Sequence, residues 1–195
     1  VNVGNYKNLF GVFNQPEFVL IDIELLNTLP DSEYVSGLAE IVKYGIIQDI
    51  EILKILEVNT KEVLSRDFEL IYDLIIKSVL IKKGIVESDE KESGYRRVLN
   101  FGHTIGHAIE SYFLESAEKK NLTHGEAIAV GMVIELYYSS QVFNFPMQLT
   151  EDLKTFVNSF YGMVNIKKED LADITDLMKF DKKNVSGKVN FVLLE

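Results

Sequence analysis

Apolar residues recur three to four positions apart along most of the chain, and only 3 prolines interrupt its 195 residues. The clearest run follows Asp67, a residue type that caps helix N-termini. That run contains Phe68, Ile71, Tyr72, Ile75, Val79 and Val86. The spacing places these side chains on one face of a helix, so the sequence predicts a mainly α fold.

Capping residues and composition shifts divide the chain into predicted elements. Pro16 and the apolar residues around it favour short β segments, as does the apolar C-terminus. A charged stretch around Gly94 is typical of a loop. The predicted helices are residues 32–47, 51–57, 68–86, 97–114 and 124–141, one capped by Thr150 and one capped by Asn165; the predicted loop is 87–97, and the predicted β segments are 9–23 and 189–194.

Charge and composition exclude several classes of protein. With 30 acidic and 20 basic residues the net charge is −10, which disfavours nucleic-acid and anionic-membrane partners. No apolar run approaches the 18 residues of a membrane span, and no signal segment opens the chain, so we expect a cytoplasmic protein. The absence of cysteine means that any transition metal must be held by His, Asp or Glu, which is typical of open, reactive sites.

The three histidines all lie within one stretch of 22 residues. His103 and His107 are four positions apart, so one helix face can present both to a metal. Thr104 stands where a metalloprotease helix needs its general-base glutamate, which disfavours that function. Two hydrogen-bonded histidines on a packed helix explain the spacing slightly better. Gly102 and Gly106 weaken a helix and therefore indicate that backbone or ligand approaches closely there.

Two further residues are candidates for the same site. Thr123 and Glu126 form a capping-box pattern, which places His124 in the first turn of a helix. A helix N-terminus favours neutral imidazole, the form that binds metal, although an ordinary exposed residue fits equally well. Glu40 lies in an apolar helix with Lys43 three residues on, and a surface ion pair is the simplest explanation for it.

Four longer motifs together resemble the 3-dehydroquinate synthase family. They are GLAEIVKYG (37–45), DEKESGYRRVLNFGHTIGHAIE (89–110), THGEAIAVGM (123–132) and DKKN (181–184). The resemblance implies the multi-helical C-terminal domain of that fold. It also implies a lyase of the shikimate pathway that uses Zn²⁺, or Co²⁺ in its place, together with NAD. Its substrate would be the sugar phosphate 3-deoxy-D-arabino-heptulosonate 7-phosphate, and its products 3-dehydroquinate and phosphate.

The resemblance also assigns roles to individual residues. It implies a metal site of Glu40, His103 and His124. It implies catalytic or substrate contacts from His107, Lys43, Lys82, Glu92, Arg96, Asn100 and one of Lys182 and Lys183. It implies cofactor contacts from Lys7, Asn8, Leu25, Leu26, Asn27 and Thr28. The two metal-ligating histidines are 21 positions apart, more than we expect for the family, and we place the extra residues in an exposed loop at 115–121.

The family has an N-terminal nucleotide-binding domain, and no glycine-rich phosphate-binding turn occurs in this sequence. We therefore expect residues 1–30 to be the end of that domain and residues 31–195 to be the helical metal- and substrate-binding domain. NAD binding and turnover, in a homodimer, are expected of the full-length enzyme and not of this chain alone. Open alternatives are an inosose or valiolone synthase, a metal-dependent polyol dehydrogenase, and a non-catalytic helical module without zinc.

Overall fold

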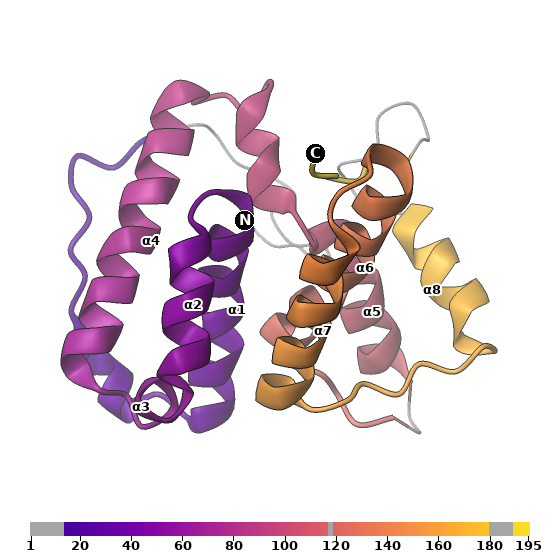
Figure 1. Cartoon of the computed structure of the whole chain (residues 1–195), viewed down its shortest axis with the longest axis horizontal. Coiled ribbons are helices and arrows are strands. Elements are labelled where there is room, and N and C mark those ends of the chain that lie inside the picture. The colour runs from indigo at the N-terminus through magenta and orange to yellow at the C-terminus, as the bar shows by residue number, and fades with distance from the viewer. Residues whose placement is uncertain (1–13, 117–118, 180–188) are drawn as a thin grey trace.

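The computed structural model describes residues 14–116, 119–179 and 189–195, and this part of the chain is helical with no strand (Figure 1). The mainly α prediction is confirmed. In chain order the elements are η1 (Ile23–Thr28), α1 (Asp31–Ile47), α2 (Ile50–Val58), α3 (Thr60–Leu64), α4 (Phe68–Ser88), η2 (Tyr95–Asn100), α5 (His103–Glu115), α6 (His124–Phe143), α7 (Met147–Tyr161) and α8 (Asp170–Lys179).

The two predicted β segments form no strand where the structure describes them. Residues 14–22 are exposed loop, and residues 9–13 lie outside the described part. At the C-terminus, the Leu194 N–H donates to Ser139 Oγ at 3.0 Å, and Thr104 Oγ1 donates to the Asn190 carbonyl at 2.9 Å. An apolar run becomes a strand only where a neighbouring strand pairs with its backbone, and here side chains of α5 and α6 bind the C-terminal segment instead.

Helix starts depend on local chemistry that the periodicity does not report. Asp67 caps α4 as predicted, with its side chain accepting from the Leu70 N–H. The Thr150 cap is wrong, because α7 begins three residues earlier, after Pro146, and Thr150 is buried. The Asn165 cap is also wrong. α8 begins at Asp170, whose side chain accepts from the Lys167 N–H at 2.8 Å and closes the preceding turn.

The helix predicted over 97–114 is broken in two at Gly102. This glycine has φ +78°, a left-handed backbone conformation that residues with a Cβ atom rarely adopt. The break separates η2 from α5 and makes His103 the first residue of a helix.

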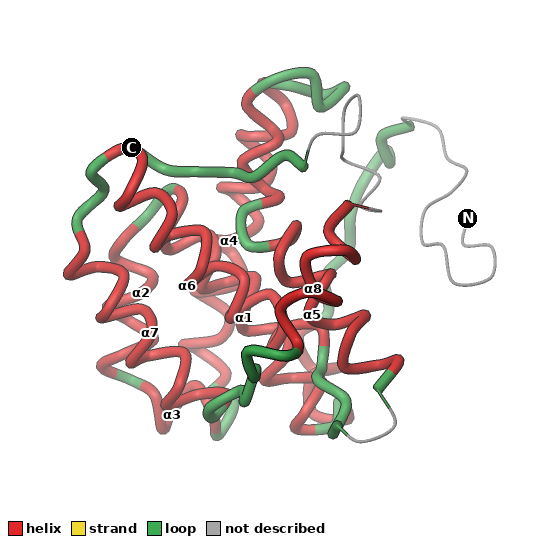
Figure 2. Tube along the Cα trace, turned by 90° about the vertical axis from the view of Figure 1, so that its right-hand side faces the viewer, coloured by secondary structure: helices red, strands yellow, loops and turns green. Residues whose placement is uncertain are grey.

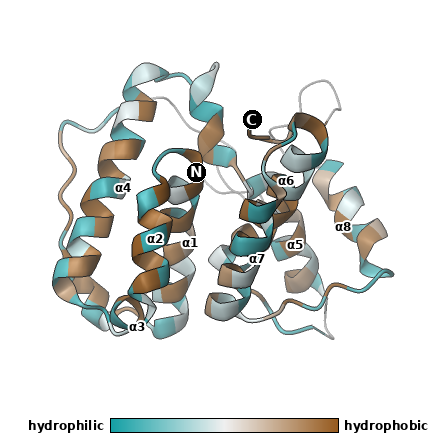
Figure 3. Cartoon of the chain, viewed as in Figure 1, coloured by the Kyte–Doolittle hydropathy of each residue, from teal (hydrophilic) through white to brown (hydrophobic). Residues whose placement is uncertain are grey.

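The central helix α6 packs against α1, α5 and α7 (Figure 2). Many of its own residues are buried, from Gly125 near its start to Ser139 near its end. The peripheral helices α2, α4 and α7 instead show alternating hydrophilic and hydrophobic bands, as amphipathic helices do (Figure 3). None of the helices in the described ranges is both long and apolar enough to span a membrane.

Glycines set how closely the central helices approach one another. A Cβ on Gly131 of α6 would lie 2.1 Å from the Gly102 carbonyl oxygen, and one on Gly106 would lie 2.9 Å from the Ile128 Cα. A Cβ on Gly125 would lie 2.0 Å from the Ser36 carbonyl oxygen in α1. The close approach that Gly102 and Gly106 indicate in the sequence is therefore confirmed, and α6 contacts two neighbouring backbones directly.

A buried carboxylate links helix α8 to α5, in addition to the apolar contacts between the two helices. Tyr112 Oη donates to Asp170 Oδ1 at 2.7 Å, and the Lys119 ammonium forms an ion pair with Oδ2. These contacts, Lys119 first, lower the pKa of Asp170 to about 2. Lys119 also lies over the rings of Tyr112 and Phe113. The expected exposed loop at 115–121 therefore contributes a largely buried lysine, and residues 117–118 lie outside the described part.

We predict that Gly131→Ala lowers the free energy of unfolding by at least about 1–3 kcal/mol, because the new methyl group meets backbone that cannot move aside cheaply. Urea denaturation measures the change. The matched control is Gly84→Ala in α4, where nothing lies within 4 Å of the new Cβ. That control should be stabilised by about 0.5–1 kcal/mol. Equal effects of the two substitutions would contradict the packing argument.

The Asp170 contacts predict a pH dependence of stability. The carboxyl has a pKa of about 2 in the folded state and about 3.9 when unfolded, so its contribution is complete above about pH 5 and is lost as the pH falls toward 2. The Tm difference between the wild type and Asp170→Asn should therefore be constant from pH 7 to about 5 and shrink below pH 4. A difference that persists unchanged at pH 2 would show that charge at Asp170 is not the cause.

Candidate metal centre

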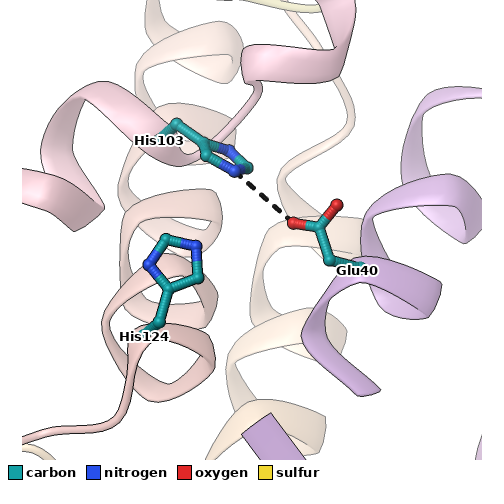
Figure 4. Close-up of side chains that lie close together, drawn as sticks. All are labelled: Glu40, His103 and His124. Carbon is teal, nitrogen blue, oxygen red and sulfur yellow. Dashed lines mark ion pairs between the residues drawn. The ribbon is translucent and has the colours of Figure 1, made fainter. Parts of the chain in front are cut away.

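Three side chains from separate helices converge on one point (Figure 4). Glu40 comes from the middle of α1, while His103 and His124 are the first residues of α5 and α6. One ligand atom from each lies within 4.8 Å of the other two. Glu40 Oε1 is 3.4 Å from His103 Nε2. The structure thus brings together the three residues that the resemblance assigns to a metal.

The local sequence explains why both histidines face this point. The predicted capping box is present: Thr123 Oγ1 accepts from the Glu126 N–H, and the Glu126 carboxylate accepts from the Thr123 N–H at 2.6 Å. This fixes the first turn of α6, where His124 lies. Glu135, buried in α6, accepts from the Gly102 N–H at 2.8 Å and holds the backbone just before His103.

Hydrogen bonds determine which nitrogen of His103 carries a proton. Its Nδ1 lies 3.0 Å from the Phe101 carbonyl oxygen, which can only accept. Nδ1 must therefore carry the proton in this contact. In the neutral ring, Nε2 then presents a lone pair toward Glu40, as a metal-ligating histidine does.

The same arrangement holds for His124. Its Nδ1 lies 3.0 Å from Glu110 Oε2, and an ionised carboxylate accepts only. Figure 4 shows the other ring nitrogen of His124 on the side of Glu40. Both histidines therefore turn an Nε2 lone pair into the same space.

Glu40 is ionised. Burial raises the pKa of its carboxyl, but His103, when its Nε2 also carries a proton, and Lys43 outweigh that effect and lower the pKa to about 2. Lys43 Nζ lies 2.6 Å from Glu40 Oε2, so the ion pair considered from the sequence does form. It does not lie on a solvated face, because the Lys43 side chain is only 3% exposed, while that of Glu40 is 40% exposed. Glu40 is therefore half-buried between its lysine and the two histidines.

The donor set fits a metal cation. Glu40 Oε1 is buried and accepts no hydrogen bond from the described residues, although the His103 ring lies close by. A carboxylate oxygen and an imidazole lone pair that face each other repel unless a proton or a cation lies between them. Two imidazoles and one carboxylate are also a common protein ligand set for catalytic zinc.

His107 lies beside this group but forms a second one. The rings of His103, His107 and His124 are mutually 5.4–5.8 Å apart. His107, Glu110 and His124 also offer ligand atoms within 4.8 Å of one another. Two ligand sets therefore share His124, and only the first contains the carboxylate from α1.

Comparisons with known proteins identify the family. A family model described as 3-dehydroquinate synthase C-terminal matches residues 37–184, and one described as 3-dehydroquinate synthase N-terminal matches residues 1–36. This chain belongs to the 3-dehydroquinate synthase family.

Curated relatives named 3-dehydroquinate synthase agree with this assignment. The protein of Dictyoglomus thermophilum is 39% identical over 193 residues, which is 99% of this chain and 53% of that protein. The protein of Alkaliphilus metalliredigens is 42% identical over 197 residues, with 99% and 53% covered. That of Parabacteroides distasonis is 37% identical over 195 residues, with 100% and 54% covered. The chain spans about half the length of the curated relatives it matches.

The family's expected substrate residues lie in three places in the described structure. Lys43 and His107 lie at the metal-ligand cluster, Lys82 lies on α4, and residues 89–100 carry Glu92, Arg96 and Asn100. Asn100 Nδ2 donates to Glu92 Oε1 at 2.8 Å, and Arg96 Nη1 donates to the Glu90 carbonyl at 2.6 Å. Lys82 is exposed on α4 and forms no hydrogen bond or ion pair within the described ranges.

Asp89, which the sequence analysis did not single out, organises that loop. Its carboxylate accepts from the backbone N–H groups of Gly94, Ser93 and Arg96, and these bonds lower its pKa to about 2. The loop includes Glu92 at φ +55°, a conformation that is uncommon without glycine. Asp89 therefore holds Arg96 and Glu92 in place from the loop's own start.

The residues expected to contact NAD are only partly described. Leu25–Thr28 lie in η1, and the Arg66 guanidinium binds this segment through the Leu26 and Leu29 carbonyls at 2.9 and 2.7 Å. The sequence does not indicate this role of Arg66, because no local pattern predicts a contact across 37 to 40 residues. Lys7 and Asn8, the other expected NAD contacts, lie outside the described residues, and so do Lys182 and Lys183, one of which is expected to contact substrate.

Glu110 is a third residue that sequence reasoning missed, after Asp89 and Arg66. It follows His107 by three positions, so both lie on the same face of α5, and that spacing is the signal that could have indicated it. Its bond to His124 joins α5 to α6 across 14 positions of sequence.

Proposed function

We propose that this chain is the metal- and substrate-binding helical domain of a 3-dehydroquinate synthase. Glu40, His103 and His124 would hold one Zn²⁺, which Co²⁺ can replace. The natural protein that carries the chain would convert 3-deoxy-D-arabino-heptulosonate 7-phosphate to 3-dehydroquinate and phosphate with retained NAD. The observation that carries the proposal is the convergence of one ionised carboxylate and two imidazole lone pairs from three helices.

The ligand set leaves room for substrate. Glu40, His103 and His124 would supply three protein ligands, the number with which catalytic zinc sites keep a position for substrate. When bound, the metal supplies Lewis acidity toward that hydroxyl, and NAD supplies the hydride acceptor. Oxidation at the neighbouring carbon acidifies a C–H bond, so that phosphate can leave by elimination.

The chain's own residues would bind and orient the anionic substrate. Lys43, held by Glu40 at 2.6 Å, places a positive charge beside the metal ligands. Arg96 is fixed at one nitrogen by the Glu90 carbonyl, and its planar guanidinium can bind a carboxylate or phosphate with its other edge. His107 lies 5.4 Å, ring to ring, from His103 and would face the substrate instead of the metal. This local basic cluster would offset the chain's net charge of −10.

The remaining roles extend the proposal on the strength of the family alone. Lys82, Glu92, Asn100 and one of Lys182 and Lys183 would complete the substrate contacts. Lys7, Asn8 and the segment Leu25, Leu26, Asn27 and Thr28 would contact NAD. We place the natural protein in the cytoplasm as a homodimer.

The metal site predicts a selective effect of Glu40→Gln in the purified 195-residue chain. Zinc affinity, measured by competition with a chromophoric chelator, should fall by well over about 100-fold, beyond the roughly 10–100-fold typical of residues that only support a ligand. Circular dichroism should show the helices intact.

Glu51→Gln is the matched control. Glu51 forms the same i,i+3 ion pair with Lys54, also at 2.6 Å, but on an exposed face. It should leave zinc affinity unchanged. If Glu40→Gln matches this control, the Glu40–Lys43 pair is merely an ion pair and the metal site is wrong.

Activity is tested in the natural protein that carries this chain. With zinc and NAD, the wild type should release phosphate from the heptulosonate phosphate and form 3-dehydroquinate, and Glu40→Gln should abolish both. A zinc-loaded wild type that forms a different cyclic product would place the protein among other sugar-phosphate cyclases. A wild type that binds no zinc would point to a non-catalytic module.

A further inference from the structure

Two possible metal-ligand sets overlap at His124, and the structure must favour one of them. One set is Glu40, His103 and His124; the other is His107, Glu110 and His124. An imidazole in its neutral form has one lone pair and one N–H, so it can serve only one of the two sets at a time. The nitrogen that carries the proton therefore decides which set can form.

Glu110 acts on that choice directly. Its Oε2 lies 3.0 Å from His124 Nδ1, a hydrogen-bond distance, and its side chain is only 21% exposed. A carboxylate that accepts the Nδ1 proton leaves the lone pair on Nε2, which Figure 4 shows on the side of Glu40. Carboxylate partners of this kind fix the tautomer and orientation of metal-ligating histidines.

We propose that Glu110 is a positioning residue that selects the Glu40–His103–His124 set by holding His124 in its Nδ1–H tautomer. The inference rests on the proposed function, because it concerns the same metal. Beyond that function, it makes Glu110 the hydrogen-bond partner of a metal ligand. The same role explains why His107 is not a ligand, although it lies four positions from His103 on one helix.

The competing possibility is that Glu110 is itself a ligand of a second metal. Glu110 and His124 Nδ1 would then bind one cation together, and the ring would have to give up its Nδ1 proton. If the first set were also filled, the same ring would have to be an imidazolate that bridges two cations, with both nitrogens deprotonated. His103, whose Nδ1 is bound by the Phe101 carbonyl, shows the arrangement that needs no such deprotonation.

The test uses Glu110→Ala, Glu110→Gln and the control Glu115→Gln, which changes an exposed glutamate at the end of the same helix. Two quantities are measured on the 195-residue chain: zinc affinity and stoichiometry by chelator competition, and the His124 tautomer in the metal-free chain by ¹⁵N NMR. Glu110→Ala should weaken zinc binding by about 10–100-fold and shift His124 toward the Nε2–H tautomer.

The conservative variant separates positioning from mere structural support. The side-chain carbonyl of glutamine can still accept the Nδ1 proton, so Glu110→Gln should keep the tautomer and bind zinc more tightly than Glu110→Ala. Glu115→Gln should match the wild type in both measurements, at one zinc per chain.

Each contrary result has a distinct meaning. An unchanged affinity and tautomer in Glu110→Ala would overturn the positioning role while leaving the metal site intact. Two zinc ions per wild-type chain, with one lost in Glu110→Ala and the other bound as before, would make Glu110 a ligand of a second site. If Glu40→Gln leaves zinc binding unchanged, the proposed function itself fails, whereas the metal-free tautomer still reports whether Glu110 holds His124.

Discussion

The whole site depends on direct backbone contact of α6 with α1 and with the turn that precedes α5. At Gly125 the helix touches the backbone of α1, and at Gly131 it touches the turn before α5; a methyl group at either glycine would lie about 2 Å from a carbonyl oxygen. The Gly125 N–H also donates to Ser36 Oγ at 2.8 Å. Because Gly125 follows His124 directly, this contact brings the start of α6 against the helix that carries Glu40. Glu40, His103 and His124 therefore lie close together because the backbones of α1, α6 and the turn before α5 are in contact.

Hydrogen-bond acceptors face one another at the point where Glu40, His103 and His124 converge. His103 Nδ1 faces the Phe101 carbonyl, and His124 Nδ1 faces the Glu110 carboxylate. Each of these two rings turns its other nitrogen toward Glu40. Lys43 forms an ion pair with one oxygen of Glu40, and the other oxygen is buried and accepts no hydrogen bond from the part of the chain that the structure describes. A set of acceptors that face one another costs free energy in the empty state, and a bound cation removes that cost. The same geometry that is unfavourable for a simple packed core is therefore suited to a metal site.

Much of the arrangement could be predicted from local sequence, because its causes are local. The capping box at Thr123 and Glu126 fixes the position of His124, and the glycines at 102 and 106 indicate close packing. What failed depends on distant contacts. Apolar residues at 189–194 suggest a strand, but side chains of α5 and α6 bind the backbone of that segment instead. The cap predicted at Thr150 failed for a local reason, because α7 begins earlier, directly after Pro146. For Glu40 the sequence offered ion pair or ligand as alternatives, and the structure combines an ion pair with a place beside both histidines.

The most direct test of the central claim is a crystal of this chain grown with zinc, with anomalous difference density recorded at the zinc edge. The account predicts one strong peak at about 2.0–2.2 Å from Glu40, His103 Nε2 and His124 Nε2. A principal peak between His107, Glu110 and His124 Nδ1, or no peak near Glu40 at all, would contradict it.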